Sequence, residues 1–221
     1  MSLPAEFFIS GKTNCEPSDV ILTEFGVNQK CFADAVESTY YEHIVPCTEH
    51  DLSATKGQLL YLKGTRALRD TLVPHKWVPE SVNNQGRVTS PDGRIAIAIS
   101  SGDMNVGTPG IPSTVSAKGS VTRNAVAANN TVPLFDVNDY ISTDDGQIGA
   151  QLLWYLLVHI DEAHNEIRLE LSLPQAVAQD GYIRNWKRRI ILDPIAIDGD
   201  NFDIFDNDTE EFDFEITQKT A

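Results

Sequence analysis

The sequence is poor in cysteine and contains no long apolar run. Its three cysteines, Cys15, Cys31 and Cys47, are an odd number, which is typical of reduced thiols rather than of a disulfide framework. The longest apolar runs, such as LLWYLLV at residues 152–158, are far shorter than the roughly 20 residues that a membrane helix requires. The first residues, MSLPAEFFISGKTN, lack the basic start and apolar stretch of a signal peptide. We therefore expect a cytoplasmic protein that has no contact with membranes.

Basic residues are few in comparison with acidic residues. The chain has 17 Lys and Arg against 32 Asp and Glu, which gives a formal net charge of −15. Binding to nucleic acid depends on Lys and Arg that displace counterions from phosphates, so direct nucleic-acid binding is not expected. A basic protein partner is expected instead, unless the acidic charge serves only solubility.

Size and hydrophobic content indicate a folded domain. The chain has 221 residues, of which 41% are hydrophobic, which is enough for one packed core. We expect a single α+β domain over residues 1–195, followed by an acidic, aromatic-containing segment over residues 196–221. That segment is expected to be either an edge strand or a tail.

The N-terminal part is expected to be largely helical. Residues 30–45 carry apolar side chains at four-residue spacing, which predicts one buried helical face. Residues 53–72 predict a second helix with Ser53 as its N-cap, and Gly57 and Gly64 leave open whether it is one broken helix or two short ones. Its expected apolar positions are Leu59, Leu62, Leu68 and Leu72.

The alternating apolar stretches after residue 86 predict a largely antiparallel sheet. A turn at Pro91, Asp92 and Gly93 precedes the alternating stretch IAIAIS, which predicts a hairpin over residues 87–100. A second hairpin is expected over residues 150–173, and a further strand over residues 182–192. A strand at residues 19–25 and a short helix at residues 117–129 complete the expected elements.

The segment at residues 100–116 is rich in glycine and proline and is therefore expected to be a loop. It follows a buried strand, a position that active-site loops favour. Ser100, Ser101 and Asp103 are its candidate ligand-binding or catalytic residues. The alternative is a loop that serves only the structure.

Metal and nucleotide motifs are incomplete. The sequence ISGKT at residues 9–13 lacks the earlier glycine of a phosphate loop, and the acids near residue 200 do not match a calcium loop. No metal or cofactor is therefore predicted. Four residues have the chemistry of zinc ligands but not a standard spacing, and whether they meet in space is left open: Cys31, His43, Cys47 and His50.

The most acidic stretch is IDGDNFDIFDNDTEEFDFEI at residues 197–216, which holds nine acids and no Lys or Arg. Its interleaved aromatic residues argue against a purely solvating coil. Alternation of acids and aromatics suits either an acidic edge strand or a segment that docks on a basic, apolar groove. The residues expected to contact such a partner are Asp203, Phe205, Asp206, Asp208, Glu210, Glu211, Phe212 and Asp213.

Three functions are compatible with these patterns. The leading hypothesis is a non-enzymatic interaction protein that engages a basic partner; its most specific form is a nucleic-acid mimic that competes for a nucleic-acid-binding protein. The first alternative is an enzyme or small-ligand-binding protein that uses the loop at residues 100–116. The second is a self-assembling structural subunit, and the sequence does not define an oligomeric state.

Overall fold

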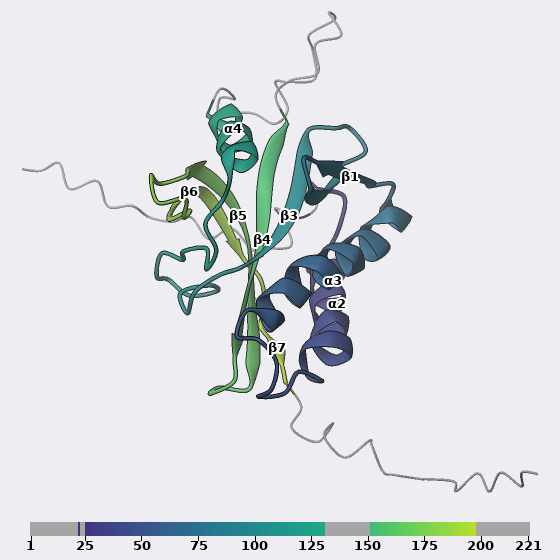
Figure 1. Cartoon of the computed structure of the whole chain (residues 1–221). Coiled ribbons are helices and arrows are strands. Elements are labelled where there is room, and N and C mark those ends of the chain that lie inside the picture. The colour runs from purple at the N-terminus through teal and green to yellow at the C-terminus, as the bar shows by residue number, and fades with distance from the viewer. Residues whose placement is uncertain (1–21, 23–24, 131–150, 198–221) are drawn as a thin grey trace, which may run out of the picture.

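The computed structural model describes residue 22 and residues 25–130 and 151–197 (Figure 1). The chain first forms α2 (Gln29–Thr39), which continues into a π-helical turn (Tyr40–Ile44), and then α3 (Thr55–Leu72) with a 3-10 turn (Val73–His75). Three strands follow, β1 (Val78–Val82), β2 (Gln85–Thr89) and β3 (Ile95–Ser101). After α4 (Ser120–Asn129) come β4 (Leu152–Asp161), β5 (Glu166–Ala176), β6 (Asn185–Ile191) and β7 (Ile195–Ala196).

The described strands form one mixed sheet in the order β1-β2-β3-β4-β5-β6, with β7 beside β5. Only β3 and β4 of these strands pair in parallel, and every other described pair is antiparallel. The parallel pair requires a crossover, which contains the loop after β3 and helix α4. The predicted α+β class with a largely antiparallel sheet and helices near the N-terminal side is confirmed.

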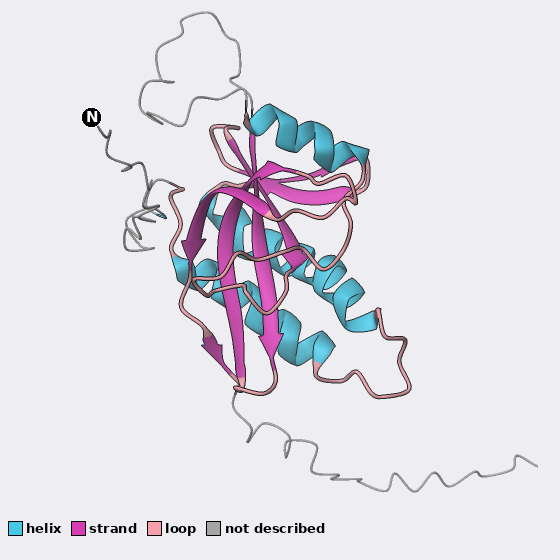
Figure 2. Cartoon of the chain, turned by 90° about the vertical axis from the view of Figure 1, so that its left-hand side faces the viewer, coloured by secondary structure: helices cyan, strands magenta, loops and turns pink. Residues whose placement is uncertain are grey.

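Both faces of the sheet are covered. Helices α2 and α3 pack on one face, while α4 and the loop after β3 lie over the other (Figures 1 and 2). Side chains alternate along β3, so Ile97 and Ile99 join the core under α2 and α3, while Ala96 and Ala98 face the α4 side. The small alanines leave room on the α4 side for larger polar groups.

The predicted helical face of α2 is confirmed, because Phe32, Val36, Tyr40 and Ile44 are all buried. The expected face of α3 is partly wrong. Leu68 and Leu72 are buried as expected, but Leu60 takes the inner position and Leu62 is 61% exposed. The N-cap residue is Ala54 without a side-chain hydrogen bond, so the expected cap at Ser53 is also wrong.

Helix α3 is continuous through both of its glycines. At Gly64 an added Cβ would lie 2.8 Å from Cδ1 of Ile99, whereas at Gly57 it would lie 3.9 Å from Oγ of Ser101. Gly64 therefore permits close packing of α3 on β3 rather than interrupting the helix.

Hairpin β1–β2 was not expected from the sequence. Its turn residues Asn83 and Asn84 have φ values of 48° and 66°, which are typical of the type I′ turn that tight hairpins favour. Tyr61 of α3 donates its hydroxyl to the carbonyl of Asn84 and accepts the N–H of Gly86, which ties the hairpin to the helix.

Strand β7 lies across the expected domain boundary at residues 195/196, and its Ile195 pairs with Ile167 of β5. The predicted strand at residues 19–25 falls almost wholly, and the acidic segment from residue 198 entirely, outside the described residues. Among the described helices, none combines the length and the apolar character that crossing a membrane requires.

Candidate functional site

The two candidate serines, Ser100 and Ser101, are consecutive residues at the end of β3, and their side chains lie on opposite faces of the sheet. Successive residues of a strand point to opposite faces, so Ser100 lies on the α4 side of the sheet and Ser101 on the α3 side. Ser101 lines one hollow, and Ser100 binds Lys118, which lines a second hollow on the other face. The predicted loop site is therefore divided between two places.

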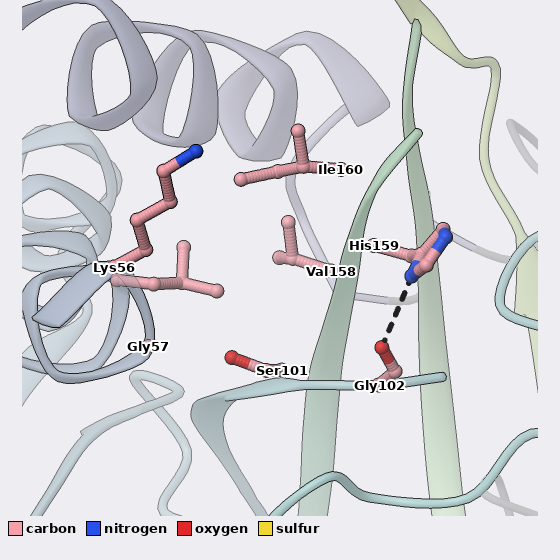
Figure 3. Close-up of a pocket in the computed structure, with 8 residues that line it drawn as sticks. Lys56, Gly57, Ser101, Gly102, Val158, His159 and Ile160 are labelled. Atoms are coloured by element: carbon pink, nitrogen blue, oxygen red, sulfur yellow. Dashed lines mark hydrogen bonds between the residues drawn. The ribbon is translucent and has the colours of Figure 1, made fainter. Parts of the chain in front are cut away.

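The hollow near Ser101 has a volume of about 170 Å³ and lies between the start of α3 and the ends of β3 and β4 (Figure 3). Its lysine, Lys56, is already paired with Glu162 at 2.8 Å. The ring of His159 lies on the far side of β4, with Nδ1 3.3 Å from the carbonyl oxygen of Gly102 (Figure 3). Both basic side chains of this hollow therefore have protein partners.

Asp103 shapes the loop. Its carboxylate accepts the backbone N–H of Asn105 at 3.0 Å, and its own N–H donates to the carbonyl of Ser113 at 2.9 Å. These bonds define a local turn. The structure brings Asp103 into hydrogen-bond contact with neither Ser100 nor Ser101.

The larger hollow, of about 340 Å³, lies on the α4 side of the sheet. Its walls come from the tip of hairpin β1–β2, from β3 and β4, and from the first turn of α4. The polar side chains in its lining belong mainly to Tyr61, Gln85, Ser116, Lys118, Thr122 and Tyr155. We refer to this hollow as the Lys118 pocket.

Lys118 is half-buried, and its ammonium is held by hydroxyl groups rather than by a carboxylate. Nζ donates to Oγ of Ser100 at 2.7 Å and to Oγ of Ser116 at 3.1 Å, and it lies 5.5 Å from the ring centroid of Tyr155. No carboxylate of the described residues forms an ion pair with it. Desolvation lowers the pKa of Lys118 to about 8.

Helix α4 begins two residues after Lys118, and its positive end lacks the usual compensating groups. Its N-cap is Gly119, which offers no capping side chain, and its first turn contains no acidic residue. The first N–H groups of a helix have no intrahelical acceptor and carry partial positive charge. The Lys118 ammonium and the positive end of α4 therefore both lie at the pocket, and no described anionic group neutralises them.

The opposite wall of the pocket is polar and neutral. Nε2 of Gln85 donates to the Tyr155 hydroxyl at 2.7 Å, and the Thr122 hydroxyl lies 3.3 Å from the same oxygen. Burial raises the pKa of Tyr155 to about 12, so its phenol is uncharged at neutral pH. Oε1 of Gln85 is buried and has no hydrogen-bond partner among the described residues.

A second polar cluster on the same face holds the loop. The fully buried carboxylate of Glu170 accepts bonds from Arg189 at 2.6 and 3.0 Å, from the N–H of Gly107 at 2.9 Å and from the hydroxyl of Ser172 at 2.5 Å. Arg189 also donates to the carbonyls of Thr108 and Gly110. The donors and acceptors of this cluster bind one another, so its role is to anchor the loop.

The four residues with zinc-ligand chemistry do not assemble. Sγ of Cys31 lies 3.6 Å from Nε2 of His75, Cys47 donates to the carbonyl of His43, and His50 points to solvent with its side chain 87% exposed. In the part of the chain that the structure describes, no group of three or more metal-ligating side chains occurs.

Sequence reasoning found Ser100 but missed the residue that binds it. Lys118 lies two positions beyond the expected loop, and Gln85 and Tyr155 come from strands far away in the sequence. The sequence Ser116-Ala117-Lys118 was the available signal, because it places a hydroxyl and an amine two residues apart before a helix. The eight predicted partner-binding residues of the acidic segment lie outside the described residues.

Comparisons with protein families, with curated proteins and with solved structures find no match for this chain.

Proposed function

We propose that this chain is a small-ligand-binding protein whose Lys118 pocket takes a small anionic ligand. The observation that carries the proposal is the ammonium of Lys118, half-buried beside an uncapped helix start and free of any ion pair with a described carboxylate. This corresponds to the sequence-based alternative of a small-ligand site near the loop after β3.

The electrostatics favour a negative group at this position. A desolvated ammonium is unfavourable unless an opposite charge accompanies it, and helix N–H groups bind carboxylate or phosphate oxygens. A charge-assisted hydrogen bond contributes about 1.5–3 kcal/mol and the helix end about 0.3–2 kcal/mol. Together these contacts amount to about 2–5 kcal/mol, which corresponds to a dissociation constant between about 30 mM and about 0.2 mM for a simple anion.

The rest of the pocket narrows the ligand class. Its volume of about 340 Å³ lies within the range of pockets for small molecules. The hydroxyl groups of Thr122 and Tyr155 in its lining favour a ligand that also carries a hydrogen-bonding N–H or O–H group. A small amino- or hydroxy-substituted carboxylate or phosphate combines both features.

Isothermal titration calorimetry with phosphate, acetate and lactate tests the proposal. We expect binding that Lys118→Met abolishes and Lys118→Arg retains, because arginine preserves the positive charge. Lys56→Met is the matched control, since Lys56 lines the other hollow and already pairs with Glu162. Absence of binding by the wild-type chain, or equal loss in the Lys56 variant, would refute a Lys118 site.

A second candidate is the interaction protein that engages a basic partner. It is favoured by the net charge of −15 and by the nine acids and interleaved aromatics of residues 197–216. Opposite charge steers association and gives it a strong dependence on salt. This proposal concerns another part of the chain, and the two functions are compatible.

A further inference from the structure

We propose that Ser116, Lys118 and Ser100 form an acyl-transfer centre, in which Ser116 is the nucleophile, Lys118 the general base and Ser100 a positioning residue. The inference rests on the proposed Lys118 pocket and adds a reaction to it. The substrate class is a small carboxylic ester or activated amide. The three residues come from the end of β3 and from the segment just before α4.

The contacts of Ser116, Lys118 and Ser100 indicate a different role for each residue. Ser116 lines the pocket, and its Oγ lies 3.1 Å from Nζ of Lys118. Ser100 is only 4% exposed; its hydroxyl donates to the carbonyl of Ser101 at 3.2 Å, so its Oγ is left to accept from Nζ. A neutral amine held by Ser100 in this way keeps its lone pair for the proton of Ser116. A nucleophile, a base within hydrogen-bond reach and a third group that orients the base are the general requirements for an activated serine.

The backbone holds these residues from both sides. The N–H of Val115 donates to the carbonyl of Ser101 at 3.1 Å, and the N–H of Lys118 donates to the carbonyl of Gly181 at 2.7 Å. Gly181 has a φ of 90°, and an added Cβ would lie 2.9 Å from Cβ of Ala117. The close approach of this glycine fixes the segment that carries both the nucleophile and the base.

The reaction balances without a further reagent. Oγ of Ser116 bonds to the acyl carbon while its proton passes to Nζ of Lys118. The tetrahedral intermediate collapses, the bond to the leaving oxygen or nitrogen breaks, and Lys118 returns the proton to that atom. Water then cleaves the Ser116 ester by the same route. The uncapped N–H groups at the start of α4 are the candidate donors for the negative oxygen of each intermediate.

The protonation state of Lys118 gives the reaction a characteristic pH profile. Of the residues that line the pocket, Lys118 is the only amine, no carboxylate is among them, and the titratable neighbours are the phenols of Tyr61 and Tyr155. With a pKa of about 8, roughly a tenth of the lysine is neutral at pH 7 and about half at pH 8. The rate should therefore rise about fivefold between pH 7 and pH 8 and level off above pH 9.

Labelling with a fluorophosphonate, followed by peptide mass spectrometry, tests the proposal on the full chain. The probe forms a covalent bond to an activated serine oxygen and releases fluoride. We expect the label on Ser116 and expect Ser116→Ala to remove it. Lys118→Arg should slow labelling at least 100-fold, because arginine cannot act as a base. Ser101→Ala is the matched control on the opposite face of β3 and should label at the wild-type rate.

The outcomes separate the two proposals. A wild-type chain that binds anions but takes no label, or takes it at another residue, overturns the acyl-transfer centre and leaves the anion pocket standing. Labelling of Ser116 that persists unchanged in Lys118→Arg also overturns it, since the base would then be elsewhere. A folded wild-type chain that neither binds anions nor takes the label overturns both proposals. Calorimetric anion binding by Lys118→Arg verifies that this variant retains a folded pocket.

Discussion

Lys118 holds a positive charge where the fold offers it hydroxyl groups and an aromatic ring but no described carboxylate. Desolvation without a compensating charge makes the protonated form unfavourable in the folded chain, which is why the pKa of Lys118 falls. Groups perturbed in this way concentrate at functional sites, where they serve binding or proton transfer at the expense of stability. The side chain should therefore lower the stability of the unliganded protein.

Replacing Lys118 by Met should raise the free energy of unfolding at pH 7 by about 1–2 kcal/mol, after allowance for its partial exposure. The pKa of Lys118 is about 8 in the folded chain against 10.5 for an ordinary lysine. Between these values the unfolded chain binds more protons than the folded one, so the wild type gains stability as pH rises. The advantage of the variant should thus shrink from pH 8 to pH 10.5, which urea unfolding of both chains measures.

The comparison of the two chains cancels the titration of all other groups. A stability difference that stays constant from pH 7 to pH 10 would show that Lys118 titrates normally. A variant that is less stable than the wild type at pH 7 would show that the contacts of the lysine outweigh its desolvation.

Two glycines of α3 allow packing to be separated from helix propensity. Gly64→Ala should destabilise the protein by about 1–2 kcal/mol, because the new methyl would press on Ile99 and overpacking outweighs the gain of about 1 kcal/mol in propensity. Gly57→Ala meets only Oγ of Ser101 at 3.9 Å and should stabilise by up to about 1 kcal/mol. Denaturant unfolding of both variants gives the comparison, and changes of the same sign would contradict it.

At the scale of elements, the long connection from β3 to α4 is a defined structure. Buried Glu170 of β5 binds the N–H of Gly107, and Arg189 of β6 binds two loop carbonyls together with that same carboxylate. These bonds fix the loop on the sheet face that it shares with the Lys118 pocket. The sheet thereby supports the segment that carries Ser116.

Arg189→Met should destabilise the protein by about 3–5 kcal/mol, since it leaves the carboxylate of Glu170 buried without its partner. The double variant Glu170→Leu/Arg189→Met should recover most of that loss because no unpaired charge remains. Chemical denaturation of the single and double variants forms the test. A double variant as unstable as Arg189→Met would mean that the loop bonds, rather than the buried charge, dominate.

The sequence predicts elements with a strong local pattern and misses those that depend on distant partners. The alternation of Ile and Ala in β3 was sufficient to predict a strand with two different faces. Hairpin β1–β2 was missed because Pro79 and polar residues obscure β1, although the Asn83-Asn84 pair is a turn signal. The sequence predicts a broken helix or two short ones around Gly57 and Gly64, because the Ile99 side chain that requires Gly64 is not visible in local sequence.

The candidate site was even less predictable than the fold. Ser100 was identified from its place after a buried strand, but the parallel pairing of β3 with β4 brings Tyr155 next to Ala98, and no local pattern encodes that register. Lys118 reaches Ser100 because the loop folds back across the sheet. The desolvation of Lys118 is a property of this tertiary arrangement. From the sequence alone, a lysine at this position is typical of an exposed turn.

At the scale of the whole molecule, the charge of the pocket opposes that of the chain. Residues 197–216 carry nine acids, and the remainder still has 23 acids against 17 bases. Charges on the surface are screened over about 8–10 Å at physiological salt, whereas contacts inside a pocket are screened much less. A locally positive pocket in an acidic protein therefore favours small anions that enter it over polyanions, which meet the overall repulsion.

The acidic segment gives a prediction of its own, measured by affinity capture from a native lysate at low and at high salt. The full-length chain should retain a basic protein at low salt and release it at high salt, because screening removes electrostatic attraction. A chain ending at Ile197 should retain none. Truncation there preserves β7 and the N–H of Ile197 that donates to the carbonyl of Asn165, so the folded part keeps its contacts.

A full-length Phe205→Ser/Phe212→Ser variant separates docking from bulk charge, since it retains every acid of the segment. If the aromatic residues anchor a partner in an apolar groove, this variant should lose at least tenfold in affinity while keeping the same dependence on salt. Capture equal to that of the wild type would mean that the segment acts through charge alone. Capture by the chain that ends at Ile197 would place the partner surface on the folded domain and contradict the role assigned to the segment.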